Sequence, residues 1–220
     1  MGILSFFAIL FLKVYIYYKM SLTDTQIFDL AKRMNIPLVF CSFKDELLNK
    51  STTKLQYNKA YIINLENEFD EDGNRNSGSH YCAFQCNKTK SGNIEPIYFD
   101  PFGIGPPEVV KTFVGYKMPY NTKDIQSIVN NACGWYCLAF LYYINTYENR
   151  KHNIYLDAED FTDLFLDLSK STEHLYNEFV LKNFFRSKSE ELRKPIEVGN
   201  GMDYKKITTN VNSIDGEDDD

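Results

Sequence analysis

The sequence has no run of lysine and arginine residues. Its 24 basic residues are scattered among 30 acidic ones, and the formal net charge is -6. Proteins that track a phosphate backbone concentrate basic side chains on one face. Nucleic acid is therefore not expected as the primary ligand. Internal repeats are also absent, and 220 residues suit one substantial domain with its own core better than two.

The cysteines do not form the pattern of a disulfide scaffold. Their number is odd, and they occur at positions 41, 82, 86, 133 and 137, so free thiols in a reducing compartment are the simpler interpretation. Two CxxxC pairs raise the possibility of zinc. The pair at 82 and 86 falls in an expected strand, where residues four apart lie ~13 Å from each other, too far to share one tetrahedral ion. No metal and no cofactor are expected.

Long hydrophobic runs are missing except at the start of the chain. Residues 3–18 are apolar but interrupted by Lys13 and short for a membrane span. They suit a membrane anchor, a helix docked elsewhere, or an upstream extension not needed for folding, and we favour the extension. We expect a hydrophobic extension over 1–19, a domain over 20–187 and a disordered acidic tail over 188–220. Membrane association is expected only through residues 1–19.

The apolar pattern predicts an α+β domain with a small, mostly antiparallel sheet flanked by helices. Strands are expected at 37–43, 59–66, 80–86 and 96–100, the last two forming a hairpin. Helices are expected from Leu22 to before Pro37, at 108–114, at 133–147, at 157–169 and at 172–186. Thr23 and Gln26 form a possible capping box for the first helix.

Cys133 stands where the buried helix begins, in "NNACGWYCLAFL". Unpaired backbone N–H groups and the positive end of the helix dipole favour a thiolate at such a position. The N–H of Cys133 can also donate to an oxyanion. Gly134 would remove a side chain that could crowd a substrate. An inert cysteine is the alternative, and Cys133 alone does not decide between the two.

Three further residues can complete a reaction centre around this thiol. Of the three histidines, His80 enters a strand from a loop and is the candidate base, whereas His152 and His174 lie in charged, surface-like surroundings. Asp100 ends the partner strand of the hairpin, where its carboxylate can orient the imidazole. Gln126 offers a neutral amide donor for a developing oxyanion.

Three stretches, "GSHYCAF", "YFDPFGIGPP" and "DIQSIVNNACGWYCLAFL", together resemble the adenovirus-type (adenain-like) cysteine protease family. The resemblance covers roughly residues 22–147 and is closest to the versions in virophages, Polinton-type elements and related large DNA viruses. The proteases of ubiquitin-like (SUMO-type) proteins are more distant relatives. Two departures stand out: Tyr81 replaces the usual tryptophan and is expected to shield the imidazole, and the third member is Asp100 where adenoviral enzymes have glutamate.

Carried over to this sequence, the resemblance implies His80 as general base, Asp100 as its orienting group, Gln126 in the oxyanion hole and Cys133 as nucleophile. Cys137 would be a buried core thiol. The implied protein is a viral thiol protease that cleaves capsid or virion precursor proteins at small, glycine-containing sites. It would act in the virion and in the virus factory of the host cytoplasm. A DNA or disulfide-linked peptide activator is not implied by these residues.

Other functions fit the same residues. A deubiquitinating or deSUMOylating protease would differ only in its substrate surface. An acetyltransferase could use the same site, although no basic cluster suits the phosphates of acetyl-CoA. The non-enzymatic alternative is a capsid-associated scaffold module that keeps the fold.

Overall fold

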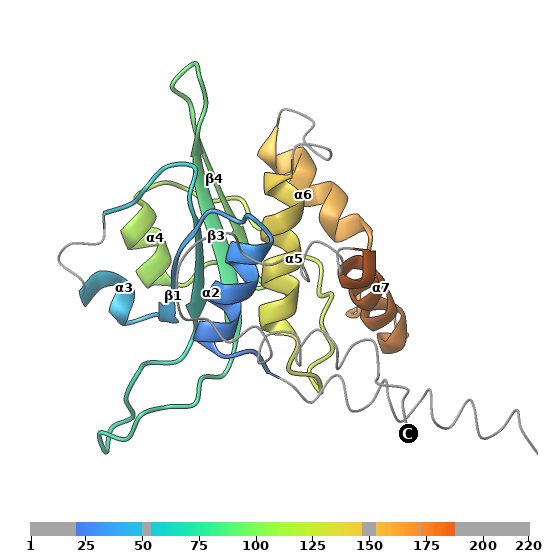
Figure 1. The fold of residues 1–220 in the computed structure, drawn as a ribbon, viewed down its shortest axis with the longest axis horizontal. Helices are drawn as coiled ribbons and strands as arrows, with labels where there is room; N and C mark the ends of the chain where they lie inside the picture. Colours follow the sequence, from blue (N-terminus) through green and yellow to red (C-terminus); the bar gives the residue numbers. More distant parts are fainter. Residues whose placement is uncertain (1–20, 50–53, 147–152, 172, 188–220) are drawn as a thin grey trace, which may run out of the picture.

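The computed structural model describes residues 21–49, 54–146, 153–171 and 173–187. The expected extensions at 1–19 and 188–220 lie outside these residues. Within them, no helix is both long and apolar enough to cross a membrane. The described residues form an α+β structure with helices around a small sheet (Figure 1).

The sheet has four strands in the order β1-β2-β3-β4, and it is mixed. β1 (Leu38–Phe43) runs parallel to β2 (Ala60–Asn64). β3 (Tyr81–Lys88) is antiparallel both to β2 and to β4 (Ile94–Phe99). The expected hairpin of β3 and β4 is therefore confirmed, and all four strands lie within about two residues of the predicted ranges. The parallel edge pair was not anticipated, because no turn signal fixes its direction.

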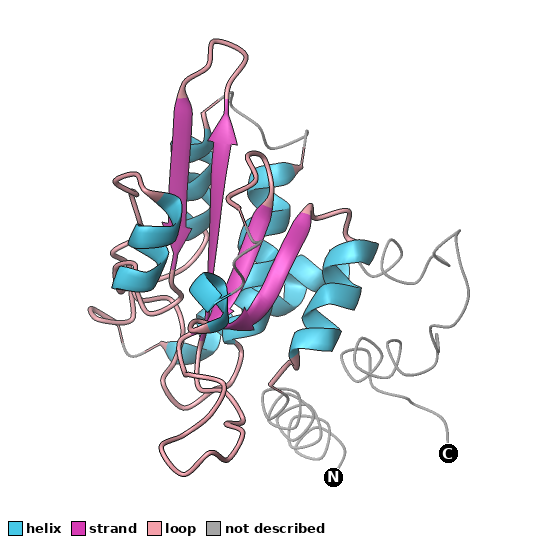
Figure 2. Cartoon of the chain, turned by 90° about the vertical axis from the view of Figure 1, so that its left-hand side faces the viewer, coloured by secondary structure: helices cyan, strands magenta, loops and turns pink. Residues whose placement is uncertain are grey.

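Helices cover both faces of this sheet (Figures 1 and 2). α2 (Asp24–Arg33), α5 (Cys133–Asn145), α6 (Ile154–Asp163) and α7 (His174–Ser187) pack on one side, around the larger apolar core. The short helices α3 (Glu46–Asn49) and α4 (Glu108–Val114) cover the other side, over a smaller core. The two cores show that the sheet is buried on both faces, which explains the near-continuous apolar runs of β2 and β3.

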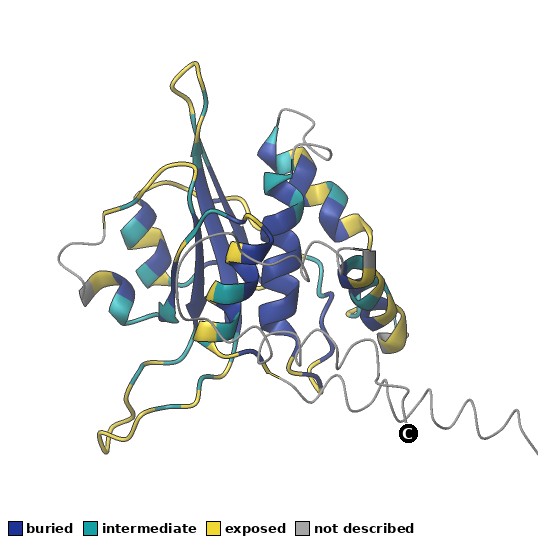
Figure 3. Cartoon of the chain, viewed as in Figure 1, coloured by how far each residue is buried: buried dark blue, intermediate teal, exposed yellow. Residues whose placement is uncertain are grey.

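α5 is the central helix of the larger core, and the prediction of a buried helix that starts at Cys133 is confirmed. Its sequence is apolar on every side, as expected of a helix that is enclosed all round. Figure 3 shows α5 in the colour of buried residues along its length. A helix held so firmly gives the residue at its first position a fixed place in the molecule.

The outer helices differ more from prediction. The capping box of Thr23 and Gln26 is present at the start of α2. α6, however, begins and ends earlier than the predicted range 157–169, because the Asn153 side chain caps its first turn. Beyond its end, the Leu166 N–H donates to the Asn177 side chain instead of continuing the helix. Apolar periodicity alone does not reveal such side-chain competition.

Candidate active site

The β3–β4 hairpin brings His80 and Asp100 together. Ala83 pairs with Phe99, so the next positions outward, Cys82 and Asp100, are opposite each other. His80 precedes Cys82 by two residues and therefore shares its face of the sheet. The result is a 2.8 Å hydrogen bond between His80 Nε2 and Asp100 Oδ1. Antiparallel register thus produces the imidazole–carboxylate contact that the sequence predicts.

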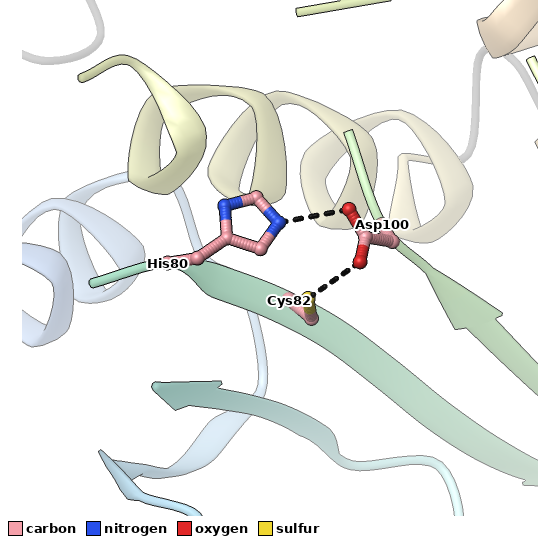
Figure 4. Close-up of side chains that lie close together, drawn as sticks. All are labelled: His80, Cys82 and Asp100. Carbon is pink, nitrogen blue, oxygen red and sulfur yellow. Dashed lines mark hydrogen bonds and ion pairs between the residues drawn. The ribbon is translucent and has the colours of Figure 1, made fainter. Parts of the chain in front are cut away.

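Asp100 is fully buried, and both its carboxylate and its backbone groups are hydrogen-bonded. Its Oδ1 also accepts from the Phe102 N–H at 2.8 Å, and Cys82 Sγ donates to Oδ2 at 3.2 Å (Figure 4). Asn121 bonds to both backbone groups of Asp100, at 2.9 and 2.6 Å. The carboxylate cannot turn away from His80 without breaking several of these bonds. No role for Cys82 was predicted, although its spacing of two from His80 places it on the same strand face.

The pKa of the His80 ring is set by burial and by its two neighbours Asp100 and Cys133. Burial lowers the pKa of His80, but hydrogen bonds and charge interactions with Asp100 and Cys133 outweigh it and raise the pKa to about 9. Nε2 faces Asp100, and Figure 4 shows the second ring nitrogen pointing away from that carboxylate. Nδ1 is therefore the nitrogen left for the Cys133 thiol. Phe102 stacks on the imidazole with ring centroids 4.5 Å apart, which fixes the ring plane.

Cys133 lies near His80 because α5 is attached to β3 one turn beyond Cys133. Cys137 Sγ, one turn further along, donates to the carbonyl oxygen of Tyr81 at 3.3 Å, next to His80 in the chain. Ala132 precedes α5 and provides no side-chain cap, and the first turn carries no acidic residue. The backbone N–H groups around Cys133 and the positive end of the helix dipole are therefore not neutralised locally.

Cys133, His80 and Gln126 line one groove of about 690 Å³. The start of α2 (21–25) and the loop residues 75–79 also line it. Cys133 is only 6% exposed, so this groove is the route by which a molecule would meet its sulfur. Geometry of this kind allows a nucleophile, a base and its orienting group to act on one bound substrate.

Gln126 lines the groove as expected, but one N–H of its side-chain amide already makes a hydrogen bond within the protein. Its Nε2 donates to the Asn130 carbonyl oxygen at 3.0 Å, and its buried Oε1 has no hydrogen-bond partner among the described residues. A primary amide carries two N–H donors. The second N–H of Gln126 is thus the donor left for an oxyanion, and that role stays a prediction.

No protein-family model matches the chain, and no curated protein is a significant match. The resemblance to adenain-like proteases therefore depends on the motifs around His80, Asp100 and Cys133. The geometry just described is an independent observation about the same residues, since it comes from register and packing. Membership of that family remains a prediction.

Two neighbours of the site have roles other than those expected. The ring stacked on His80 is Phe102, whereas the Tyr81 hydroxyl donates to the Asp24 carboxylate of α2. A Cβ added at Gly134 would lie 3.2 Å from Ile27 Cδ1. The glycine therefore allows α5 to approach α2, and does not simply leave room for substrate.

One group of described residues has the composition of a metal site. The donor atoms of His80, Cys82 and Asp100 lie within 4.8 Å of one another. Both His80 and Cys82 make hydrogen bonds to the same carboxylate, one to each oxygen. A metal ion would have to replace both bonds beside the fully buried Cys82 and Asp100 side chains. The hydrogen-bond network accounts for the proximity of these three residues, so we assign no metal to them.

The loop that leads into His80 depends on a glycine, and Gly78→Ala is expected to disturb the site. Gly78 has φ +86°, and an added Cβ would overlap the Asn64 side-chain amide. That amide group accepts hydrogen bonds from the N–H groups of Glu66 and Ser79. We expect Gly78→Ala to lower the free energy of unfolding by about 1–3 kcal/mol.

Thermal and urea unfolding would measure this loss. Gly73→Ala is the matched control, because Gly73 also has a positive φ (+80°) but meets nothing within 4 Å. Equal destabilisation by the two substitutions would mean that the contact with Asn64 does not matter.

Proposed function

We propose that this protein is a cysteine endopeptidase with Cys133 as its nucleophile. One observation carries the proposal: the His80 imidazole is hydrogen-bonded at 2.8 Å to a buried carboxylate and lines the same groove as the Cys133 thiol, which helps to raise its pKa. An activated nucleophile needs a base in contact with it and a third group that orients the base. A structural cysteine at a helix start needs neither.

The proposed reaction proceeds through a thioester. The proton of the Cys133 thiol passes to His80, and the sulfur attacks the carbonyl carbon of the scissile peptide bond. The Cys133 backbone N–H and the Gln126 amide donate to the oxyanion. His80 then gives its proton to the leaving amine as the C–N bond breaks. A water molecule, deprotonated by His80, attacks the thioester and releases the acid product and the thiol.

The groove suits an extended peptide. Its walls are rich in uncharged polar side chains, among them Ser21, Thr23, Asn76, Ser79 and Asn131. Such groups can hydrogen-bond a peptide backbone without demanding charge on the substrate. The resemblance to adenain-like proteases suggests virion precursor proteins, cut at small glycine-containing sites during capsid maturation. We adopt this substrate class as part of the proposal.

A reactive peptide probe tests the proposal directly. We expect a peptidyl vinyl sulfone with glycine next to the warhead to add once to the protein, at Cys133, since that thiol lines the groove beside His80, whereas burial raises the pKa of the other four thiols. Intact mass and peptide mapping would locate the adduct. Co-expression with candidate capsid precursors would then show whether they are cut. A probe that spreads over several cysteines, or spares Cys133, would refute the proposal.

A further inference from the structure

α7 holds both ends of the segment that carries the Gln126 amide. Asn177 Nδ2 donates to the carbonyl oxygen of Ile125 at 3.0 Å, immediately before Gln126. The next residue of α7, Glu178, accepts at Oε1 from Asn130 Nδ2 at 3.0 Å. Two consecutive residues of α7 thus hold the segment between Ile125 and Asn130. We call Asn177 and Glu178 the α7 clamp.

Asn130 connects the clamp to the amide in the groove. Its side chain is held by Glu178 and also accepts, at Oδ1, from the Ala132 N–H at 3.4 Å. Its backbone carbonyl accepts from Gln126 Nε2. All of these groups are buried: Gln126 is 2% exposed, Asn130 6% and Glu178 8%. The bond to Glu178 therefore fixes a side chain whose own backbone orients Gln126.

The orientation of the Gln126 side-chain amide depends on its hydrogen bond to the Asn130 carbonyl oxygen. Oε1 has no partner among the described residues, so the Nε2 bond to Asn130 is the contact that distinguishes the two ends of the amide. Rotation by half a turn would exchange the N–H groups and the oxygen. An oxygen directed at a developing oxyanion would repel it instead of stabilising it. If the Asn130 carbonyl moved, the Gln126 amide would lose the hydrogen bond that makes one of its two orientations more stable than the other.

We propose that Glu178 and Asn177 are positioning residues for the reaction at Cys133. They fix the Ile125–Asn130 segment so that Gln126 presents an N–H to the oxyanion. This inference rests on the proposed function. It gives a role to α7, which lies beyond the part of the sequence that carries the protease-like motifs.

The attachment of α7 to the core does not require the clamp carboxylate. Leu181 and Phe185, further along the same helix, are buried, and Phe185 packs edge-on against Trp135 with ring centroids 5.0 Å apart. Apolar burial of this kind stabilises the docked helix independently of Glu178. A substitution at Glu178 can therefore separate an effect on the segment from loss of the helix.

Three variants of the full chain test the proposal. Glu178→Ala removes the acceptor, Glu178→Gln keeps an oxygen that can accept the same bond, and Glu173→Ala removes an exposed carboxylate next to the same helix. With a fluorogenic peptide that ends in Gly-Gly, we expect kcat of Glu178→Ala to fall about 10- to 100-fold, with KM changed less than about threefold. Glu178→Gln should regain most of this loss, and Glu173→Ala should match the wild type.

Alkylation of Cys133 by iodoacetamide is the second readout. It should change less than about threefold in Glu178→Ala, because the contacts of His80 with Asp100 and Cys133 do not involve the clamp. Unchanged kcat in Glu178→Ala would overturn the proposal. Equal losses of alkylation and kcat would also overturn it, since they would indicate general damage to the site.

Hydrogen exchange tests the α7 clamp independently of whether the protein is a peptidase. Backbone amides over 125–132 should exchange at least about tenfold faster in Glu178→Ala than in Glu173→Ala, because the segment loses a fixed end. Identical exchange would refute the clamp even in a protein without peptidase activity. If the wild type cleaves no peptide but Glu178→Ala still shows the faster exchange, the proposed function is refuted and the clamp is kept.

Discussion

Replacement of Cys133 by alanine is expected to reduce peptide cleavage by at least about 10³-fold, because no thioester can form without the sulfur. The loss should appear in kcat and should not be accompanied by unfolding. Cys133 is the first residue of α5, where alanine is a good helix former. Cleavage of a fluorogenic peptide, followed beside thermal unfolding, measures both quantities.

Cys41→Ala is the matched control for this substitution. Cys41 and Cys133 are both 6% exposed, but burial and the Asp24 charge raise the pKa of the Cys41 thiol well above its usual value. A thiol of this kind stays protonated and unreactive at neutral pH. Cleavage that survives in Cys133→Ala, or is lost in Cys41→Ala, would show that the nucleophile lies elsewhere.

Asp100→Asn is expected to lower kcat/KM by about 10²- to 10⁴-fold, because the imidazole loses the anion that orients it and stabilises its protonated form. Asp100 raises the pKa of His80 through a hydrogen bond and through its charge, and with Cys133 it brings that pKa to about 9. Without the carboxylate charge, the pKa of His80 should fall. The alkaline limb of the pH–rate profile should therefore move to lower pH.

The sign of the linked stability effect follows from the same shift. A histidine with a raised folded-state pKa stabilises the protein fully below its unfolded pKa, near 6.5, and this contribution disappears as the pH rises through about 9. The difference in unfolding free energy between pH 6 and pH 9 should be smaller in Asp100→Asn than in the wild type. Asp72→Asn, at an exposed position, is the control. An unchanged pH profile in Asp100→Asn would exclude the carboxylate from this role.

The β3–β4 hairpin and the buried helix α5 could be predicted from the sequence because each depends on a local pattern of residues. Short runs of β-favouring residues and a turn-prone connection specify β3 and β4, and register then brings Asp100 to His80. The all-apolar run after Cys133 likewise specifies α5. The contact between imidazole and carboxylate was thus predictable from short-range information. The catalytic roles of these residues stay predictions.

Other features depend on contacts between distant segments, which a single sequence does not reveal. Glu178 looks like a solvated residue of an amphipathic helix, yet it is buried against Asn130, 48 residues earlier in the chain. Phe102 follows a strand in a turn-rich stretch, but its ring covers His80. The early end of α6 similarly reflects a side chain of α7. Tertiary hydrogen bonds override local propensity at each of these positions.

The clamp has a consequence for protein synthesis. Ribosomes deliver the chain from its N-terminus, so the thiol, the imidazole and the carboxylate emerge well before Glu178 and Asn177. On our proposal, a nascent chain that ends short of α7 already contains the nucleophile and its base but lacks the residues that orient the oxyanion donor. Full proteolytic activity would arise only once α7 has been synthesised, which would spare neighbouring proteins from an unfinished enzyme.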